Sequence, residues 1–293
     1  MGSGAFREGL IMKTYSKIAK VVYGQMTSDG AGVTLNRIFG FYEEGLFDPF
    51  LLMDNFGADD PEEYIAGFPW HPHRGIETVT YMLDGRVEHE DSMGNKGIIG
   101  KGDIQWMTAG SGIVHQEMPQ SDGSRMSGFQ LWVNLPASKK MMAPRYQEIK
   151  AAQVPTLNLE SGAIIKVIAG KFNDTKGPVE DIVADPIYFD VEVPANAEFD
   201  IDVHDDYTVF CYAFEGEANF DEERKQLIRK GQGALLRNGN CVKVTTGSSN
   251  VRFIMISGKP IKEPIAWRGP IVMNTDEELA VAFSEYRKGT FIK

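Results

Sequence analysis

The sequence is poor in the residues and patterns that define several classes of protein. It has two cysteines, Cys211 and Cys241, in 293 residues, too few for a disulfide scaffold, so we expect two reduced, buried thiols in a cytoplasmic protein. No apolar run is long enough for a transmembrane helix, and the N-terminus lacks a convincing signal peptide, which predicts a protein with no membrane association. Residues 1–11 read either as native sequence or as a leader before a start at Met12, and they play no part in the fold prediction.

Positive charge is also in short supply. Lysine and arginine number 30 against 41 aspartates and glutamates, which gives a net charge of −11. Because nucleic-acid binding depends on basic surface facing phosphates, we expect no direct nucleic-acid binding. A small-molecule substrate or a protein partner remains open.

Helical periodicity is almost absent from the sequence. Short runs of β-forming residues alternate with glycine turns, as in Glu77–Gly85 followed by Gly94–Gly97 and Ile104–Thr108, which indicates an all-β barrel or sandwich. The exception lies near the C-terminus, where Thr275 and Glu278 form a capping-box pattern. Apolar residues at helical spacing follow it, so we expect a short C-terminal helix that packs on a barrel; these residues are Leu279, Ala282, Phe283 and Tyr286.

Histidine is scarce, yet three of the five histidines lie in two short stretches. His71 and His73 form one pair at i and i+2, and His115 forms another with Glu117. Residues i and i+2 of a strand face the same side, about 7 Å apart, so each strand can direct both of its side chains at one point. Three imidazoles and a carboxylate suit one transition metal, with Fe, Mn, Ni, Cu or Zn all open.

These residues lie in motifs that resemble two known groups of proteins. The two-part pattern resembles that of cupin β-barrels; it consists of Gly67, His71, His73, Glu77, Gly85, Gly102, Gly110 and His115. Longer stretches resemble the pirin family from about residue 20 to residue 288; they are 48–54, 71–75, 105–110, 131–135 and 269–275. The resemblance implies iron as the metal. It also implies that Glu117 is the fourth ligand, with Glu77, a ligand in many cupins, as a hydrogen-bond partner of the ligands or a structural carboxylate.

The second half of the chain repeats parts of the first. Tyr81–Gly85 matches Tyr212–Gly216, and Lys101–Gly102 matches Lys230–Gly231. Together with the cupin resemblance, this predicts two tandem cupin (jelly-roll-like) β-barrels. The predicted units are an N-terminal metal-binding barrel at 12–137, a linker at 138–154, and a degenerate C-terminal barrel with the terminal helix at 155–293. Among the four ligand positions, only that of His73 has a counterpart of the same residue type in the second barrel, His204. We expect His204 to be partly exposed and not a ligand, so the prediction is one metal per chain.

Four further residues near the site each carry an expectation. We expect Trp70, Trp106 and Met107 to lie in the barrel core, because aromatic residues dominate cores. His89 follows the turn at Gly85, and we expect it to be exposed.

Two functions of different class follow from the motifs. A metal with open positions can hold a substrate oxygen and O₂ together, while Glu117 accepts a substrate proton as the catalytic base. The pirin resemblance implies such an activity, that of a quercetin 2,3-dioxygenase, which opens the ring of a flavonol and releases carbon monoxide. It equally implies a non-enzymatic alternative, an iron-dependent cofactor of transcription regulators that binds a protein partner. An open apolar cavity beside the metal would favour the enzyme.

Overall fold

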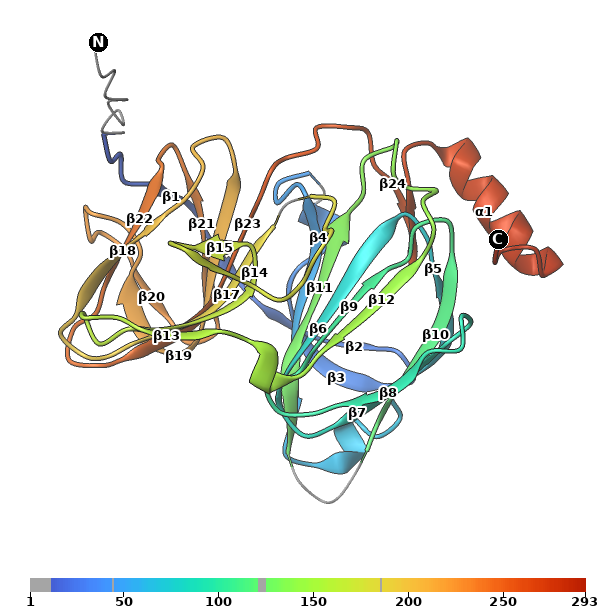
Figure 1. Ribbon diagram of the computed structural model, residues 1–293, viewed down its shortest axis with the longest axis horizontal. Coiled ribbons are helices and arrows are strands. Elements are labelled where there is room, and N and C mark those ends of the chain that lie inside the picture. The colour runs from blue at the N-terminus through green and yellow to red at the C-terminus, as the bar shows by residue number, and fades with distance from the viewer. Residues whose placement is uncertain (1–11, 44, 121–124, 185) are drawn as a thin grey trace, which may run out of the picture.

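The computed structural model describes residues 12–43, 45–120, 125–184 and 186–293, so the predicted leader lies outside the described residues. Strands dominate it, and they form two barrels side by side, with the one α-helix of the described residues at the C-terminal end (Figure 1). The predicted all-β class, the two barrels and the short C-terminal helix are therefore confirmed. No helix in the described ranges is long and apolar enough to cross a membrane.

The first barrel is built from two antiparallel sheets. The larger has the order β12-β9-β6-β11-β4-β3-β2 and the smaller the order β5-β10-β7-β8. The strands of the larger sheet are β2 (Gln25–Asp29), β3 (Val33–Phe39), β4 (Phe50–Ala58), β6 (Ile76–Asp84), β9 (Ile104–Thr108), β11 (Met126–Asn134) and β12 (Arg145–Ile149). The smaller sheet contains β5 (Phe68–His73), β7 (Val87–Asp91), β8 (Lys96–Ile99) and β10 (Ile113–Pro119).

Strand β10 shows why this barrel has a defined interior. Its odd-numbered residues are buried and its even-numbered residues are half-buried, the alternation of a strand with one face on a core. In the ladder, His115 lies opposite His71 of β5 on one side and opposite Asp91 of β7 on the other. The side chains of all three strands can therefore meet inside the barrel.

The second barrel continues around one long path of strands, β1-β21-β19-β23-β17-β14-β13, with β18, β20 and β22 attached to it. Its strands are β1 (Lys17–Tyr23), β13 (Thr156–Asn158), β14 (Ile164–Ala169), β17 (Ile187–Val193), β18 (Glu198–Asp202), β19 (Thr208–Asn219), β20 (Leu227–Arg229), β21 (Gln232–Arg237), β22 (Cys241–Thr245) and β23 (Val251–Gly258). Small elements complete the chain: a hairpin of β15 (Lys171–Phe172) and β16 (Thr175–Lys176), and 3₁₀ turns at Phe41–Glu43, Pro61–Glu63 and Ala151–Gln153. Both cysteines are buried and free, as predicted.

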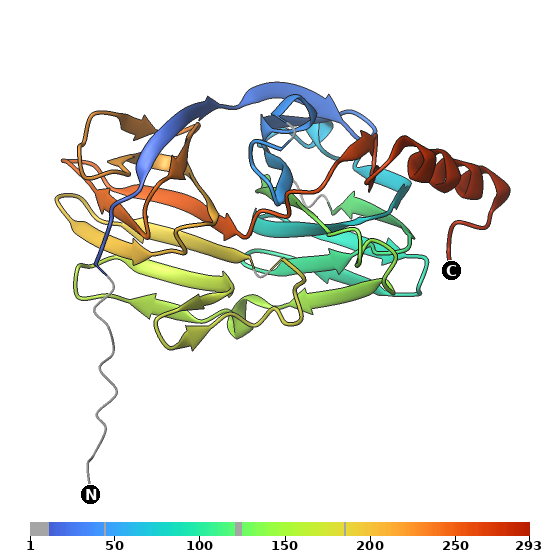
Figure 2. The ribbon, with the colours of Figure 1, turned by 90° about the horizontal axis from the view of Figure 1, so that it is seen from above.

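The two ends of the chain each belong to the barrel of the other half. Strand β1 lies within the predicted range 12–137 but pairs with β21 of the second barrel, and Figure 2 shows the blue N-terminal strands running from one barrel to the other. At the other end, β24 (Ala266–Arg268) and β25 (Ile271–Met273) form a hairpin beside β5, with Arg74 bridging to Ile271. The predicted linker also contains a strand, since β12 pairs with β9 of the first barrel.

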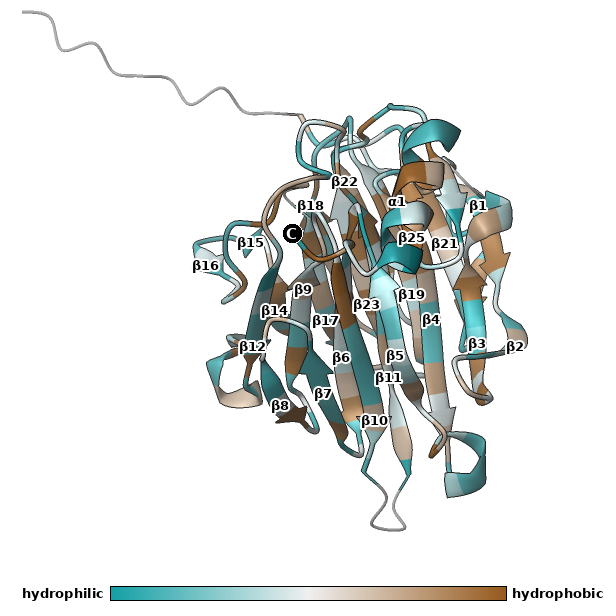
Figure 3. Cartoon of the chain, turned by 90° about the vertical axis from the view of Figure 1, so that its right-hand side faces the viewer, coloured by the Kyte–Doolittle hydropathy of each residue, from teal (hydrophilic) through white to brown (hydrophobic). Residues whose placement is uncertain are grey.

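Helix α1 (Asp276–Lys288) begins and ends as its sequence indicates. The Thr275 side chain accepts from the backbone N–H of Glu278, and the Glu278 carboxylate accepts from the backbone N–H of Thr275. Gly289 ends the helix in a left-handed conformation, in which its backbone N–H satisfies carbonyls of the last turn. Leu279 and Ala282 are buried against β25, as predicted, whereas Tyr286 is exposed. Figure 3 looks onto this side of the molecule, where α1 lies over β25.

The barrels are held together by a shared apolar core. The larger sheet of the first barrel contributes Val79 and Phe129, and the second barrel contributes Tyr212 and Ile254 to the same cluster. Strand β6 is consequently buried on both faces along most of its length. One of its faces looks into the first barrel and the other meets the second barrel.

Candidate metal centre

Three histidines converge inside the first barrel, as the sequence predicts. The side chains of His71, His73 and His115 each offer one ring nitrogen, and these nitrogens lie within 4.8 Å of one another. Nε2 of His71 is 3.1 Å from Nε2 of His73. The strand pairing causes this arrangement, because β5 and β10 are neighbours and His115 lies opposite His71.

The other ring nitrogens of His71 and His73 face backbone carbonyls. Nδ1 of His71 is 2.9 Å from the Pro69 oxygen, and Nδ1 of His73 is 3.0 Å from the Pro270 oxygen. A carbonyl only accepts, so each Nδ1 carries the proton and each Nε2 keeps its lone pair. Outer hydrogen bonds of this kind orient a histidine toward a metal.

His115 is oriented by a buried polar chain instead of a carbonyl. Its Nδ1 lies 3.4 Å from Nδ1 of His89, whose Nε2 is 3.2 Å from an oxygen of Asp91. The Gln105 amide nitrogen lies 2.7 Å from the same Nδ1 of His89, and the Tyr146 ring stacks on the imidazole at 4.6 Å. One set of protons is compatible with these contacts: His89 donates from Nε2 to Asp91, and the single lone pair of its Nδ1 is shared by Gln105 at 2.7 Å and by the more distant N–H of His115 at 3.4 Å.

The expectation that His89 is exposed is therefore wrong, since its side chain is fully buried. The strand β7 carries it toward the barrel interior, where it pairs in register with Glu117 of β10. A sequence signal was present, because Val87, His89 and Asp91 alternate on one face and Val87 is apolar. All three of these residues are buried.

Burial keeps two of the converging histidines, His73 and His115, neutral. It lowers the pKa of His73 to about 3, with the neighbouring His71 adding to the effect. Burial, and then His73, His71 and His89, also lower the pKa of His115 well below its ordinary value. A neutral imidazole is the form that binds metals, so burial holds His73 and His115 in the ligand state.

The remaining donor atoms fit a metal ion. Nε2 of His115 is buried and has no hydrogen-bond partner among the described residues, which is costly for a buried polar atom unless an ion satisfies it. Glu117 follows on the same face of β10, and its Oε1 accepts a 2.9 Å hydrogen bond from the Thr80 hydroxyl. The structure thus brings together the three histidines, while Glu117 lies in the adjoining wall; its role as fourth ligand stays a prediction.

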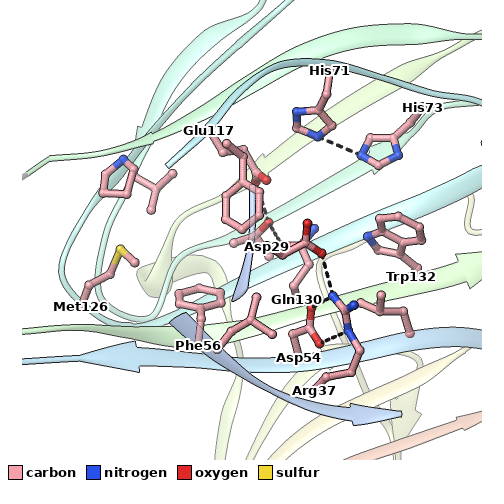
Figure 4. Close-up of a pocket in the computed structure, with 16 residues that line it drawn as sticks. Asp29, Arg37, Asp54, Phe56, His71, His73, Glu117, Met126, Gln130 and Trp132 are labelled. Atoms are coloured by element: carbon pink, nitrogen blue, oxygen red, sulfur yellow. Dashed lines mark hydrogen bonds and ion pairs between the residues drawn. The ribbon is translucent and has the colours of Figure 1, made fainter. Parts of the chain in front are cut away.

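A cavity of about 70 Å³ adjoins the histidines, and its walls are mainly apolar. The apolar part of the lining consists of Leu35, Leu52, Phe56, Phe68, Val87, Pro119, Met126 and Trp132. Figure 4 shows His71 and His73 on one side of this space, with Glu117 beside them and Trp132 near His73. An outer chamber of about 540 Å³ shares Phe68, both histidines and Trp132 with the inner one, so the two form one path from the surface to the site.

An ion-pair cluster borders both chambers. Arg37 donates to Asp54 through two bonds of 2.9 and 2.8 Å and to Asp29 through one of 2.8 Å (Figure 4). Burial raises the pKa of Asp54 to about 6, although the Arg37 guanidinium opposes the shift. The cluster adds charged groups to the lining of the inner cavity, and Asp29 and Arg37 also line the outer chamber.

The remaining expectations have mixed outcomes. Trp106 and Met107 are fully buried, as predicted, whereas Trp70 is 48% exposed, so its assignment to the core is wrong. The cause is strand parity: His71 and His73 face inward on β5, so Trp70, which directly precedes His71, faces outward. Glu77 is buried and accepts a 2.7 Å hydrogen bond from Thr108.

His204, the one histidine of the second barrel, lies apart from this site. It is exposed, as predicted, and its ring lies 4.5 Å from that of Tyr207. Within the described ranges, His71, His73 and His115 are the one group of side chains arranged to hold a metal. One metal per chain remains a prediction.

Comparison with known proteins gives consistent matches along the chain. The Pirin family matches residues 32–133, and the Pirin C-terminal cupin domain matches residues 188–292. A pirin-like protein of Caulobacter vibrioides is 46% identical over 94% of this chain and 98% of its own length. A solved quercetin 2,3-dioxygenase from Acinetobacter baumannii is 31% identical to this chain and superimposes with a TM-score of 0.88. The match covers 95% of this chain and 99% of that chain. A bacterial pirin from Escherichia coli, solved with nickel(II), has 19% identity and a TM-score of 0.65, with 82% of this chain and 98% of that chain covered; it supports the fold alone.

Proposed function

The chain belongs to the pirin family, whose members carry two cupin domains, and from that membership we propose that it is an iron-dependent dioxygenase of the quercetin 2,3-dioxygenase type. The observation that carries the proposal is a mainly apolar cavity that opens directly beside His71 and His73, two of the three converging histidines. This is the arrangement that favours an enzyme over a purely protein-binding module. The likeness to a solved quercetin 2,3-dioxygenase supports the same reaction class.

His71, His73, His115 and Glu117 are the proposed ligands of the metal. Imidazole and carboxylate suit iron as well as several other divalent ions, so iron rests on the family and not on the donor set. When bound, iron supplies Lewis acidity toward a substrate oxygen and a route for electrons to O₂. The reaction balances, since both atoms of O₂ enter the organic product and one ring carbon leaves as carbon monoxide.

The two chambers fit a flat aromatic substrate. Ligand pockets in proteins usually measure about 300–1,000 Å³, a range that the outer chamber of about 540 Å³ meets and the inner cavity of about 70 Å³ does not. We therefore place the reacting edge of the flavonol in the inner cavity and its remaining ring in the outer chamber. Phe68 and Trp132 line both chambers and offer aromatic surface to that ring.

Glu117 is the proposed general base. Its carboxylate lines the cavity beside the histidines, within the space where a substrate hydroxyl would lie. The Thr80 hydroxyl donates to its Oε1 at 2.9 Å, which holds the carboxylate in place to take the 3-hydroxyl proton. Proton transfer to a positioned base of this kind contributes about 10²- to 10⁴-fold to a rate.

The test is oxygen uptake with quercetin by iron-loaded, desalted protein, together with loss of the flavonol absorbance band. Desalting matters because free metal oxidises flavonols slowly in air. We expect turnover in the wild type, no turnover in His115→Ala, and a loss of about 10²-fold or more in Glu117→Gln beyond any loss of iron. If the wild type is no faster than His115→Ala, the enzyme proposal fails for flavonols, and the non-enzymatic cofactor role becomes the better account.

A further inference from the structure

A second cavity lies between the two barrels, on the far side of the sheet that walls the metal site. This interbarrel cleft measures about 560 Å³. Its lining includes Lys101, Lys166, Lys230, Arg252, Asp84 and Glu215. Leu35 and Phe56 border both this cleft and the inner cavity of the metal centre, so the two spaces are separated by side chains of β3 and β4.

The cleft is built from matched parts of the internal repeat. In the first barrel, the N–H of Gly102 donates to the Met82 carbonyl at 2.8 Å; in the second, the N–H of Gly231 donates to the Ala213 carbonyl at 2.8 Å. These are corresponding positions of the repeated turns, and both glycines have left-handed backbones, with φ of 82° and 84°. Each turn therefore presents its preceding lysine, Lys101 or Lys230, to the same cleft from opposite barrels.

Charge sets this cleft apart from the rest of the protein. Its lining holds five basic side chains against two acidic ones, whereas the whole chain has a net charge of −11. Both acidic residues also come from matched positions, Asp84 at the end of β6 and Glu215 on β19. A local excess of positive charge on an acidic protein concentrates small anions at that place.

Part of this positive charge is already neutralised within the protein. The buried carboxylate of Asp190 accepts two hydrogen bonds from Arg252, at 2.9 and 2.7 Å, and one of 2.7 Å from Tyr81. Lys166 lies 3.7 Å from the same carboxylate.

Lys101 and Lys230 differ from these groups. Both are exposed, and within the described part of the chain neither ammonium makes a hydrogen bond or an ion pair. Two free ammonium groups therefore face the cleft above a floor in which Arg252 and Lys166 are paired with the carboxylates of Asp190 and Glu215.

We propose that the interbarrel cleft binds a small organic anion with at least two acidic groups, carboxylates or phosphates. Lys101 and Lys230 hold one acidic group each, which is why a polyanion binds more tightly than a monoanion. The volume lies within the usual range for small-molecule sites, about 300–1,000 Å³. The site is separate from the metal centre and does not depend on the proposed reaction.

The test is calorimetric titration of the metal-loaded protein with two probes at constant ionic strength. Tricarballylate represents the carboxylate class and fructose 1,6-bisphosphate the phosphate class, and metal content is measured before and after to exclude chelation. We expect saturable binding of one molecule per chain by at least one probe, and the stronger probe identifies the class. Acetate and inorganic phosphate, the matched small anions, should bind more weakly by about tenfold or more.

Variants then locate the binding site. Lys101→Glu with Lys230→Glu should weaken binding by about a hundredfold, and either single change to alanine by about tenfold, since a hydrogen bond to a charged group contributes about that much. The control pair is Lys259→Glu with Lys288→Glu, which makes the same change in net charge at two exposed lysines outside the cleft. Absence of saturable binding by both probes, or an equal loss in the control pair, would overturn the proposal.

Discussion

Replacing His89 by phenylalanine should weaken metal binding although His89 is not a proposed ligand. His115 has its Nδ1 3.4 Å from His89, and its Nε2, on the side of the site, has no hydrogen-bond partner in the part of the chain that the structure describes. Phenylalanine keeps the stacking surface for Tyr146, which lies 4.6 Å from the His89 ring, but offers no acceptor. His115 then loses the bond that fixes its proton on Nδ1 and its lone pair on Nε2.

The size of the effect follows from the position of His89 in this chain of hydrogen bonds. Loss of an outer hydrogen bond to a metal-binding histidine typically lowers metal affinity about 10- to 100-fold, equivalent to about 1.4–2.7 kcal/mol. Gln105 and Asp91 also lose a partner, at 2.7 and 3.2 Å from His89. We therefore expect some loss of stability in the metal-free protein as well, of about 1–3 kcal/mol.

The assay is competition between the protein and a chelator for one metal, with unfolding of the metal-free protein measured in parallel. His89→Asn is the matched control, because its Oδ1 occupies nearly the place of Nδ1 and can accept from His115. We expect His89→Asn to retain most of the affinity that His89→Phe loses. Equal metal affinity in wild type and His89→Phe, with both folded, would refute the reasoning that His89 orients His115.

Three further predictions concern stoichiometry, pH and the barrel interface. Metal analysis should find one ion per chain, lost in His71→Ala and retained in His204→Ala; a second ion bound at His204 would contradict the single site. Burial raises the pKa of Glu77 to about 7, above its unfolded value, so ionisation of this carboxyl opposes folding. In metal-free protein the free energy of unfolding should therefore fall by roughly 3 kcal/mol as pH rises from about 4.5 to 7. Denaturant titrations at several pH values should show this fall in the wild type and not in Glu77→Gln. Tyr81→Phe removes a 2.7 Å bond to buried Asp190 and should cost about 1–3 kcal/mol, measured by chemical unfolding; an unchanged midpoint would show that the bond contributes nothing net.

Local pattern predicted the centre of the site because strand geometry alone brings its parts together. His71, His73 and His115 required only i, i+2 alternation and neighbouring strands, and the ladder between β5 and β10 supplies both. The buried partner His89 was missed because its environment depends on β7 lying beside β10. Aromatic character alone predicts Trp70 in the core, but its position on β5 next to inward-facing His71 directs its side chain outward.

The barrels themselves were predictable, but the way the chain is divided between them was not. Turn residues and the repeat indicated two β-barrels. No local pattern shows that β1 pairs with β21, or that β12 in the predicted linker pairs with β9. These pairings join segments far apart in sequence, and only the three-dimensional packing selects them.

The exchanged termini affect the order in which the chain can mature during its synthesis. Nδ1 of His73 is held by the Pro270 carbonyl, 197 residues later in the chain. Arg74, next to it, donates to the carbonyl of Phe291 at 2.9 Å and lies over that ring at 4.2 Å. A ribosome that has completed all strands of the first barrel has therefore still not made the groups that orient His73 and cover Arg74. The proposed metal ligands are translated early, but their final arrangement depends on residues 270–291. Termination before those residues would yield a protein with every proposed ligand present and an unfinished site.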